Sequence, residues 1–232
     1  MKIKEGTLTK AGKIDRRRKY VLMIDTETAG SLARPIFYDI GFAVVDKKGR
    51  IYESFSMVNY DVYIKEWRKM DSCFFADKLP IYEEELIGKC RTMSNTRAIR
   101  KIILELLEKY NIDTVCGHNM RFDFRAMNNT WHLVGGKGNF LPDYIVYWDT
   151  LAMARSVIQD RPTYIRFCEE YGFVTEKTKK PRLTAEALYA YIMYEPDFEE
   201  EHTGFEDVLI ETVIFAYLMK IHKKMTKVIE VA

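Results

Sequence analysis

The sequence predicts an α/β fold in which a mixed central sheet is flanked by helices. Residues 20–24 form an uninterrupted apolar run, which is typical of a strand buried on both faces. Residues 35–46 and 51–58 flank the turn-like stretch 47–50, so we expect an antiparallel hairpin there. Farther along, a strand pattern lies between two helical patterns, and this order predicts parallel pairing with the first strand.

The stretch after the hairpin is the hardest part of the chain to assign. Residues 59–93 place aromatic residues between charges, and we expect one or two short helices that wrap the sheet edge as an insertion. The simpler interpretation of these aromatic side chains is that they pack in the core. The alternative is that they stack on nucleobases. Ser94 is the expected N-cap of a helix that ends at Asn111. Residues 112–117 then form the strand that pairs with the first one.

The second half of the chain alternates short helical and strand patterns. In chain order we expect a glycine-rich loop at 135–142, a strand at 144–148 and helices at 149–157, 163–171 and 184–194. Asp149 is the expected N-cap of the first of these helices. A longer helix follows Thr203, because Thr203 and Glu206 fit a capping box and apolar residues continue at helical spacing.

The bulk composition is that of a globular protein. The chain has 232 residues and a net charge of +2, so any contact with nucleic acid must be local. We expect a basic N-terminal leader at 1–18 and a single domain at 19–232. No apolar run approaches the roughly 20 residues that span a membrane. The four cysteines lack metal-ligand spacing, which predicts reduced thiols and a cytoplasmic protein.

Two carboxylates follow the first apolar run. Asp25 and Glu27 are two residues apart, so their side chains point the same way on a strand. Neighbouring acids at the end of a buried strand repel each other and lose hydration, and Mg²⁺ or Mn²⁺ would relieve both costs. The alternative is a wet strand end at which Asp25 begins a turn toward Gly30. The pair therefore indicates a metal site only if the rest of the chain adds ligands.

Three further residues fit the same site. Asp123 follows the strand that pairs with the first one, and the carboxyl ends of parallel strands share one edge of a sheet. Asp207 lies in the last long helix and His202 precedes it, at two positions where an apolar pair is usual. The alternative is an exposed histidine beside an acid that the helix dipole favours. Together the acids and the histidine describe a hydrolase with two metal ions and a histidine base.

Two basic stretches have a simple and a functional interpretation. One lies at residues 10–19 and the other at residues 177–182. The simple interpretation is that both are solvated. The functional one is that they contact the phosphates of a nucleic acid.

The motifs, in this order, resemble those of the DEDDh 3′–5′ exonucleases. That group includes the proofreading epsilon subunit of bacterial replicative DNA polymerase, ribonuclease T and oligoribonuclease. The family's Asp-x-Glu-Thr motif resembles residues 25–28, its His-Asn and Phe-Asp motif resembles 118–123, and its third motif, which ends in Asp, resembles 202–207. The helix start at Asp149 is also similar to the family's segment before the third motif. The resemblance covers residues 19–222.

The resemblance implies a ribonuclease H-like fold whose first three strands are antiparallel. It implies that Asp25, Glu27 and Asp207 hold the metal ion nearer the nucleophile. Asp25 would bridge to a second ion beside Asp123, and His202 would be the general base. The implied cofactors are two Mg²⁺ or Mn²⁺ ions.

The implied substrate is the 3′ end of single-stranded DNA or RNA, which would release nucleoside 5′-monophosphates. Thr28, Ala29 and Asn119 are the implied substrate contacts, whereas Phe122 is expected to pack beneath the site. A polymerase is a candidate partner, in replication or repair. The abundance of Lys, Ile and Tyr is typical of phage or low-GC bacterial proteins, and a phage protein would act in the host cytoplasm.

Two other functions remain open at this point. One is a non-catalytic module on the same fold that binds nucleic acid or a polymerase, although such a copy would usually lack one of the acids. The other is a phosphodiesterase that acts on a dinucleotide. The motifs carry no information on DNA against RNA or on the oligomeric state.

Overall fold

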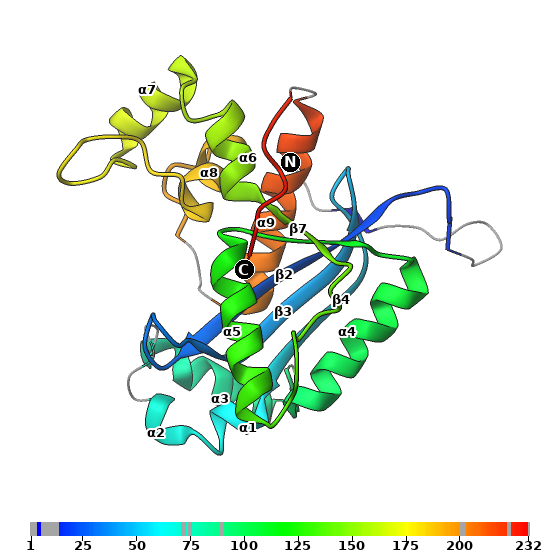
Figure 1. Cartoon of the computed structure of the whole chain (residues 1–232). Helices are drawn as coiled ribbons and strands as arrows, with labels where there is room; N and C mark the ends of the chain where they lie inside the picture. The colour runs from blue at the N-terminus through cyan, green and yellow to red at the C-terminus, as the bar shows by residue number, and fades with distance from the viewer. Residues whose placement is uncertain are drawn as a thin grey trace.

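Seven strands form one mixed sheet in the part of the chain that the computed structural model describes, which is residues 4–5, 14–70, 73, 76–88, 91–199, 203–221 and 224–231. The hydrogen-bonded order is β1-β4-β3-β2-β6-β7, and β5 pairs with β4. The strands are β1 (Lys4–Glu5), β2 (Tyr20–Ala29), β3 (Ile36–Asp46), β4 (Arg50–Asn59), β5 (Thr92–Ser94), β6 (Thr114–Gly117) and β7 (Val146–Asp149). Figure 1 shows β2, β3 and β4 running side by side through the middle of the molecule.

The directions of the strands agree with the prediction. β2 pairs antiparallel with β3, and β3 pairs antiparallel with β4. β6 runs parallel to β2, and β7 runs parallel to β6. The predicted mixed sheet is therefore confirmed. The two residues of β1 lie within the stretch predicted as a leader, and they pair in parallel with β4.

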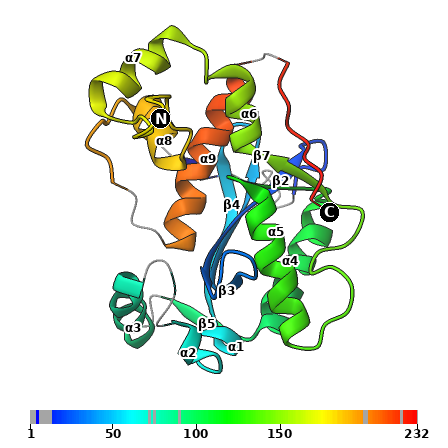
Figure 2. The ribbon, with the colours of Figure 1, turned by 60° about the vertical axis from the view of Figure 1, so that its left-hand side comes forward.

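Helices cover both faces of the sheet. They are α1 (Tyr60–Tyr63), α2 (Trp67–Met70), α3 (Leu79–Ile87), α4 (Thr96–Tyr110), α5 (Met120–Leu133), α6 (Thr150–Val157), α7 (Pro162–Tyr171), α8 (Ala185–Met193) and α9 (Gly204–Lys220). Successive residues of β2 point to opposite faces. Leu22 and Ile24 pack with α4 and α5, whereas Val21 and Met23 pack with α6 to α9. Figures 1 and 2 show these two helical layers on either side of the sheet.

The insertion after β4 is more broken than predicted. Instead of one or two helices it contains α1, α2, a 3₁₀ turn (Ala76–Lys78) and α3, followed by β5. Residues close in sequence determine where α1 and α3 begin. The side chain of Asn59 accepts a hydrogen bond from the N–H of Asp61 at the start of α1, and Pro80 lies in the first turn of α3. The short helices gather at the end of the sheet formed by β4 and β5 (Figure 2).

The predicted cap of α4 is wrong by one residue. Ser94 is the last residue of β5 and pairs with Asn59. The next residue, Asn95, accepts the N–H of Ala98 through its side chain and is the N-cap. Ser94 is thus used in strand pairing, although its local sequence favours a role as the helix N-cap.

The last described segment closes the outer edge of β7. The carbonyl of Lys227 accepts the N–H of Asp149, and the N–H of Ile229 donates to the carbonyl of Tyr147. A strand edge covered in this way offers fewer free backbone groups to other chains. Among the described residues, no helix combines the length and apolar character needed to cross a membrane.

Candidate active site

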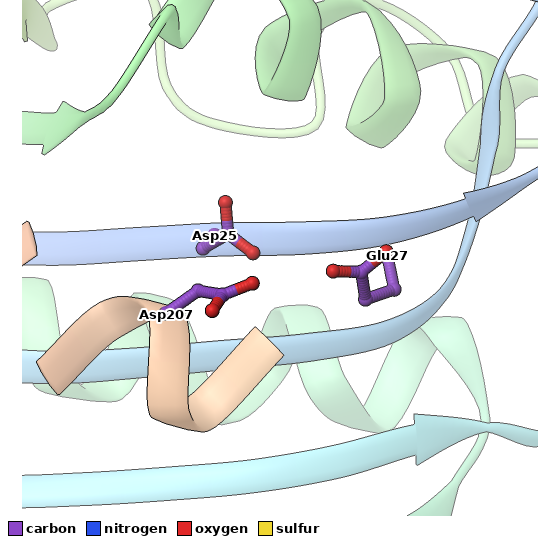
Figure 3. Close-up of side chains that lie close together, drawn as sticks. All are labelled: Asp25, Glu27 and Asp207. Atoms are coloured by element: carbon purple, nitrogen blue, oxygen red, sulfur yellow. The ribbon is translucent and has the colours of Figure 1, made fainter. Parts of the chain in front are cut away.

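Three carboxylates from two distant parts of the chain meet at one place. Asp25 and Glu27 come from β2 and Asp207 comes from the first turn of α9. One ligand oxygen of each lies within 4.8 Å of the other two. Figure 3 shows the three carboxyl groups gathered between the strand and the helix. We call these three residues the carboxylate triad.

The pleat of β2 decides which layer each residue faces. Val21 and Met23 point toward the layer that contains α9, and Asp25 and Glu27 continue this series of alternate positions. Thr26, between the two acids, points the other way and contacts Asp123 of α5. The spacing of the two acids therefore brings both of them to α9.

The N-terminus of α9 reaches the triad because two glycines let the backbones approach closely. A Cβ on Gly41 would lie 2.0 Å from the carbonyl oxygen of Gly204. Gly41 is also the register partner of Asp25 in the sheet. The N–H of Gly204 donates to Oδ2 of the buried Asp39 at 3.1 Å. Thr203 is the N-cap by position, as predicted, but its side chain makes no capping hydrogen bond, and Asp39 accepts from the helix start instead.

The insertion is connected to the start of α9 through the same aspartate. Oδ2 of Asp39 also accepts from Nη1 of Arg91 at 2.8 Å and from the hydroxyl of Tyr82 at 3.0 Å. Arg91 is buried, donates to Glu85 at 2.6 Å and lies 3.8 Å from Glu206 in the first turn of α9. The short helices of the insertion thus contribute to holding the helix that carries Asp207.

Asp123 lies where β6 ends. β6 pairs with β2 at Leu22 and Met23, so no β6 partner is available for the N–H of Thr26. Oδ1 of Asp123 accepts from that N–H at 3.1 Å and from the Thr26 hydroxyl at 2.8 Å. The structure therefore brings Asp123 to the strand that carries two of the triad acids, although Asp123 is not one of the three mutually close ligands.

Glu211 is a fifth acid at this site, and it is absent from the residues predicted. It lies four residues after Asp207, on the same face of α9, and only 2% of its surface is exposed. Its Oε1 accepts from the backbone N–H of His118 at 3.0 Å. The spacing from Asp207 is the sequence signal that identifies it, because an acid among Ile210, Thr212 and Val213 faces a buried surface.

His118 connects Glu211 to the loop before α8. Nε2 lies 2.7 Å from the carbonyl oxygen of Leu183, which can only accept, so Nε2 carries the proton. Nδ1 lies 2.9 Å from the hydroxyl of Thr150. Burial lowers the pKa of His118, which favours the neutral ring with Nδ1 as an acceptor. Both ring nitrogens are thus used in holding the fold.

Burial, and after it the repulsion between like charges, disfavours the charged forms of these acids. The pKa of Asp25 is raised well above its ordinary value, first by burial and then by four neighbouring acids. Burial raises the pKa of Asp123 to about 7. A bound cation would remove the repulsion and replace the lost hydration. The donors are all carboxylate oxygens, which suit hard ions such as Mg²⁺ and Mn²⁺, so the residues fit the predicted metal.

The acids open into a cleft of about 920 Å³. Thr28 and Asn119 line it, and Asn119 does so as the exposed N-cap residue of α5. Phe122 borders the cleft, whereas we expected it beneath the site. Ala29 packs into a hydrophobic cluster and does not line the cleft. The predicted base, His202, lies outside the described residues.

A second part of the cleft wall is basic. It consists of Arg155 at the end of α6, and of Lys180 and Arg182 in the loop between α7 and α8. All three side chains are exposed. We call these three residues the basic wall. Lys180 and Arg182 belong to the stretch 177–182 for which the sequence left solvation and phosphate contact open.

No family model and no curated protein matches the sequence. Solved structures of exonuclease I do match the fold. The E. coli enzyme in complex with a 5cy-dT13 oligonucleotide is 19% identical, with a TM-score of 0.57 over 89% of this chain and 41% of that chain. A product-bound exonuclease I is 17% identical, with a TM-score of 0.55 over 88% of this chain and 44% of that one.

The zinc-bound complex of E. coli exonuclease I with single-stranded DNA is 16% identical, with a TM-score of 0.53. That alignment covers 89% of this chain and 41% of the other, so the chain spans less than half of the exonuclease I chains it matches. At these identities the similarity concerns the fold. The ribonuclease H-like fold predicted from the motifs is therefore confirmed.

Proposed function

We propose that this chain is a metal-dependent 3′–5′ exonuclease that removes nucleoside 5′-monophosphates from the 3′ end of single-stranded DNA or RNA. The observation that carries the proposal is the meeting of Asp25, Glu27 and Asp207 within 4.8 Å in an open cleft, with two more acids beside them. The similar structures include exonuclease I in complex with single-stranded DNA and with an oligonucleotide, which supports the same class of substrate.

Each acid has a distinct role in this proposal. Asp25, Glu27 and Asp207 would hold one metal ion, and Asp25 and Asp123 would contribute to holding a second. Thr26 fixes the orientation of Asp123 through two hydrogen bonds to Oδ1. The other oxygen, Oδ2, would then be the one that binds a metal ion. Bound metal ions supply Lewis-acid activation and neutralise charge on the phosphate.

The reaction is a hydrolysis at the last phosphodiester. His202 takes a proton from the attacking water, and the water oxygen forms a new bond to phosphorus. The bond between phosphorus and the 3′ oxygen of the preceding nucleotide breaks, and that oxygen is protonated. The products are a nucleoside 5′-monophosphate and a chain with a new 3′ hydroxyl. Thr28, Asn119 and Phe122 line the cleft, and we propose that they contact the terminal nucleotide.

The test is a cleavage assay on short single strands of DNA and RNA that carry a 5′ label. We expect a ladder of products that shorten from the 3′ end with Mg²⁺ or Mn²⁺, and no products with EDTA. A strand blocked by a 3′ phosphate separates exonuclease from endonuclease cleavage, because the exonuclease needs a free 3′ end.

Asp25→Asn provides the matched variant, since it removes a ligand charge with little change of volume. We expect it to lose at least about a hundredfold in turnover, given the size of the effect of a displaced catalytic ion. Metal-independent binding of both strands without cleavage would instead support a non-catalytic module. Cleavage restricted to dinucleotides would support the small-molecule phosphodiesterase.

A further inference from the structure

The basic wall is poised next to the acids without being neutralised by them. Arg155, Lys180 and Arg182 line the same cleft as the carboxylate triad. Within the described residues, no ion pair joins any of the three to a carboxylate. Arg182 donates from Nε to the carbonyl of Val174 at 3.1 Å, which leaves its other nitrogens for a ligand. Cations that share a cleft with five acids without an ion pair to them are available to bind an anion.

The loop that carries two of these cations has a defined shape. Val174 forms an antiparallel bridge with Pro181. The N–H of Thr175 donates to the carbonyl of Lys180 at 2.9 Å, and the N–H of Lys180 donates back to the Thr175 hydroxyl at 3.2 Å. The N–H of Arg182 donates to the carbonyl of Phe173 at 2.8 Å. The backbone of Lys180 is thus held at both its N–H and its carbonyl, which lowers the entropy lost when its side chain binds a ligand.

The loop is also fixed relative to the acids. His118 donates from Nε2 to the carbonyl of Leu183, next to Arg182, and its backbone N–H donates to Glu211 beside the triad. One residue therefore connects the basic wall to the acidic side of the cleft. The separation between the two is set by the fold and not by the ligand.

The polarity of the substrate decides which anion the basic wall can meet. At a 3′ end, the scissile phosphate is the last phosphate of the strand. Every other phosphate lies on its 5′ side. If the acids hold the scissile phosphate, any other phosphate of the strand that reaches the basic wall must therefore lie on the 5′ side of the scissile bond.

We propose, on the basis of the proposed function, that the basic wall binds the phosphodiester backbone on the 5′ side of the scissile bond. The cleft is then built for a strand of several nucleotides and not for a dinucleotide. Contacts to phosphates carry no information on base or sugar, so the basic wall serves DNA and RNA equally. This assigns Arg155 of α6, and Lys180 and Arg182 of the loop before α8, to substrate binding.

The experiment compares two substrates of the same protein. One is a 5′-labelled oligothymidylate, which has upstream phosphates. The other is the p-nitrophenyl ester of thymidine 5′-monophosphate, which offers the scissile phosphodiester and no further phosphate. Its hydrolysis breaks the bond between phosphorus and the aryl oxygen and releases p-nitrophenolate. The variants are Lys180→Ala and Arg155→Ala, and the control is Lys177→Ala, a cation of the same loop that does not line the cleft.

We expect Lys180→Ala and Arg155→Ala each to raise KM for the oligonucleotide about threefold to tenfold, with kcat little changed. The dependence of log KM on log salt should weaken by about 0.7 for each phosphate contact removed. Hydrolysis of the aryl ester should match that of the parent protein, and Lys177→Ala should match it on both substrates. An oligoribonucleotide should show the same rise in KM as DNA.

Other outcomes separate the two proposals. If the parent protein hydrolyses neither substrate with metal present, the proposed function is wrong. If it hydrolyses both, and Lys180→Ala and Arg155→Ala behave like Lys177→Ala, the assignment of the basic wall is wrong while the exonuclease stands. An equal loss on both substrates also overturns the assignment, because it places the effect at the scissile phosphate.

Discussion

The backbone of Gly41 touches the backbone of Gly204 so closely that a Cβ on Gly41 would lie 2.0 Å from the Gly204 carbonyl oxygen. This contact joins the middle of β3 to the first residue of α9. Gly41 is the register partner of Asp25, and Gly204 is three residues before Asp207. The packing of two glycines therefore sets how closely the helical ligand approaches the strand ligands.

Gly41→Ala should push α9 away from β2. No side chain rotation can relieve the clash, because its partner is backbone. We expect a loss of about 1–3 kcal/mol in the free energy of unfolding and a larger relative loss of metal-dependent turnover, measured by urea unfolding and by the cleavage assay. The control Gly138→Ala has a positive φ but nothing near its Cβ. It should lose about 1–2 kcal/mol, the cost of the left-handed conformation for a residue with a Cβ, and keep its turnover.

The buried pair of Asp39 and Arg91 should show strong coupling. Arg91→Met leaves an unpaired buried carboxylate and should lose about 3–5 kcal/mol of stability. Asp39→Asn with Arg91→Met removes both charges, so we expect it to be more stable than Arg91→Met alone. Urea unfolding of the four proteins of the double-mutant cycle measures this difference. Additive losses would show that the two residues act independently.

Removing one acid should stabilise the protein when metal is absent. In EDTA, Asp25→Asn removes both the cost of burying a charge and the repulsion from the neighbouring acids, which together raise the pKa of Asp25. We expect its Tm in EDTA to rise by about 2–4 °C for each kcal/mol of repulsion removed, and the increase in Tm that Mg²⁺ causes in the parent protein to shrink. Asp160→Asn, at an exposed position, should change neither value. A fall in the Tm of Asp25→Asn in EDTA would contradict the proposed repulsion.

The metal-free protein should lose stability as the pH rises. The pKa of Asp123 is about 7 in the folded protein and 3.8 in its ordinary state. Between these values the folded protein keeps a proton that the unfolded chain has released, so the free energy of unfolding falls with increasing pH. The loss should be complete above pH 7. Thermal unfolding in EDTA across this range measures it, and Asp123→Asn should flatten the curve.

His202→Gln should separate catalysis from metal binding. If His202 is the base, turnover should fall by about a hundredfold to ten-thousandfold, while the Mg²⁺-dependent increase in Tm is preserved. The matched comparison is Asp207→Asn, which should lose turnover and the increase in Tm together. Unchanged turnover in His202→Gln would remove the histidine from its role.

Short-range patterns are enough to predict most of the framework. The hairpin of β3 and β4, the apolar run in β2 and the helix-strand-helix order each depend on a few neighbouring residues, and all three agree with the structure. The same holds for the side of β2 on which Asp25 and Glu27 lie, because a strand alternates with a period of two. The prediction of Ser94 as the N-cap of α4 is wrong because Ser94 pairs with β4 instead.

Three features depend on contacts between residues far apart in the chain. Asp39 reads as an ordinary polar residue of a strand, yet it accepts hydrogen bonds from the insertion and from the start of α9. Arg155 and Lys180 lie in different elements and share a wall of the cleft only after α6, α7 and α8 have packed together. Local sequence patterns do not predict these contacts, because the contacts arise from the packing of whole helices and strands.

Residue types and their order in the chain were sufficient to suggest a metal site and its candidate ligands, because strand and helix periods place side chains on predictable faces. The ribonuclease H-like fold was implied by the resemblance of the motifs to those of the DEDDh exonucleases. Folding decided how the ligands meet. The close approach of Gly41 and Gly204 brings Asp207 to β2, and the end of β6 leaves room for Asp123. The loop before α8 brings Lys180 and Arg182 to the wall of the cleft. Distances of a few ångströms between remote segments follow from tertiary packing, and they determine which charges act together.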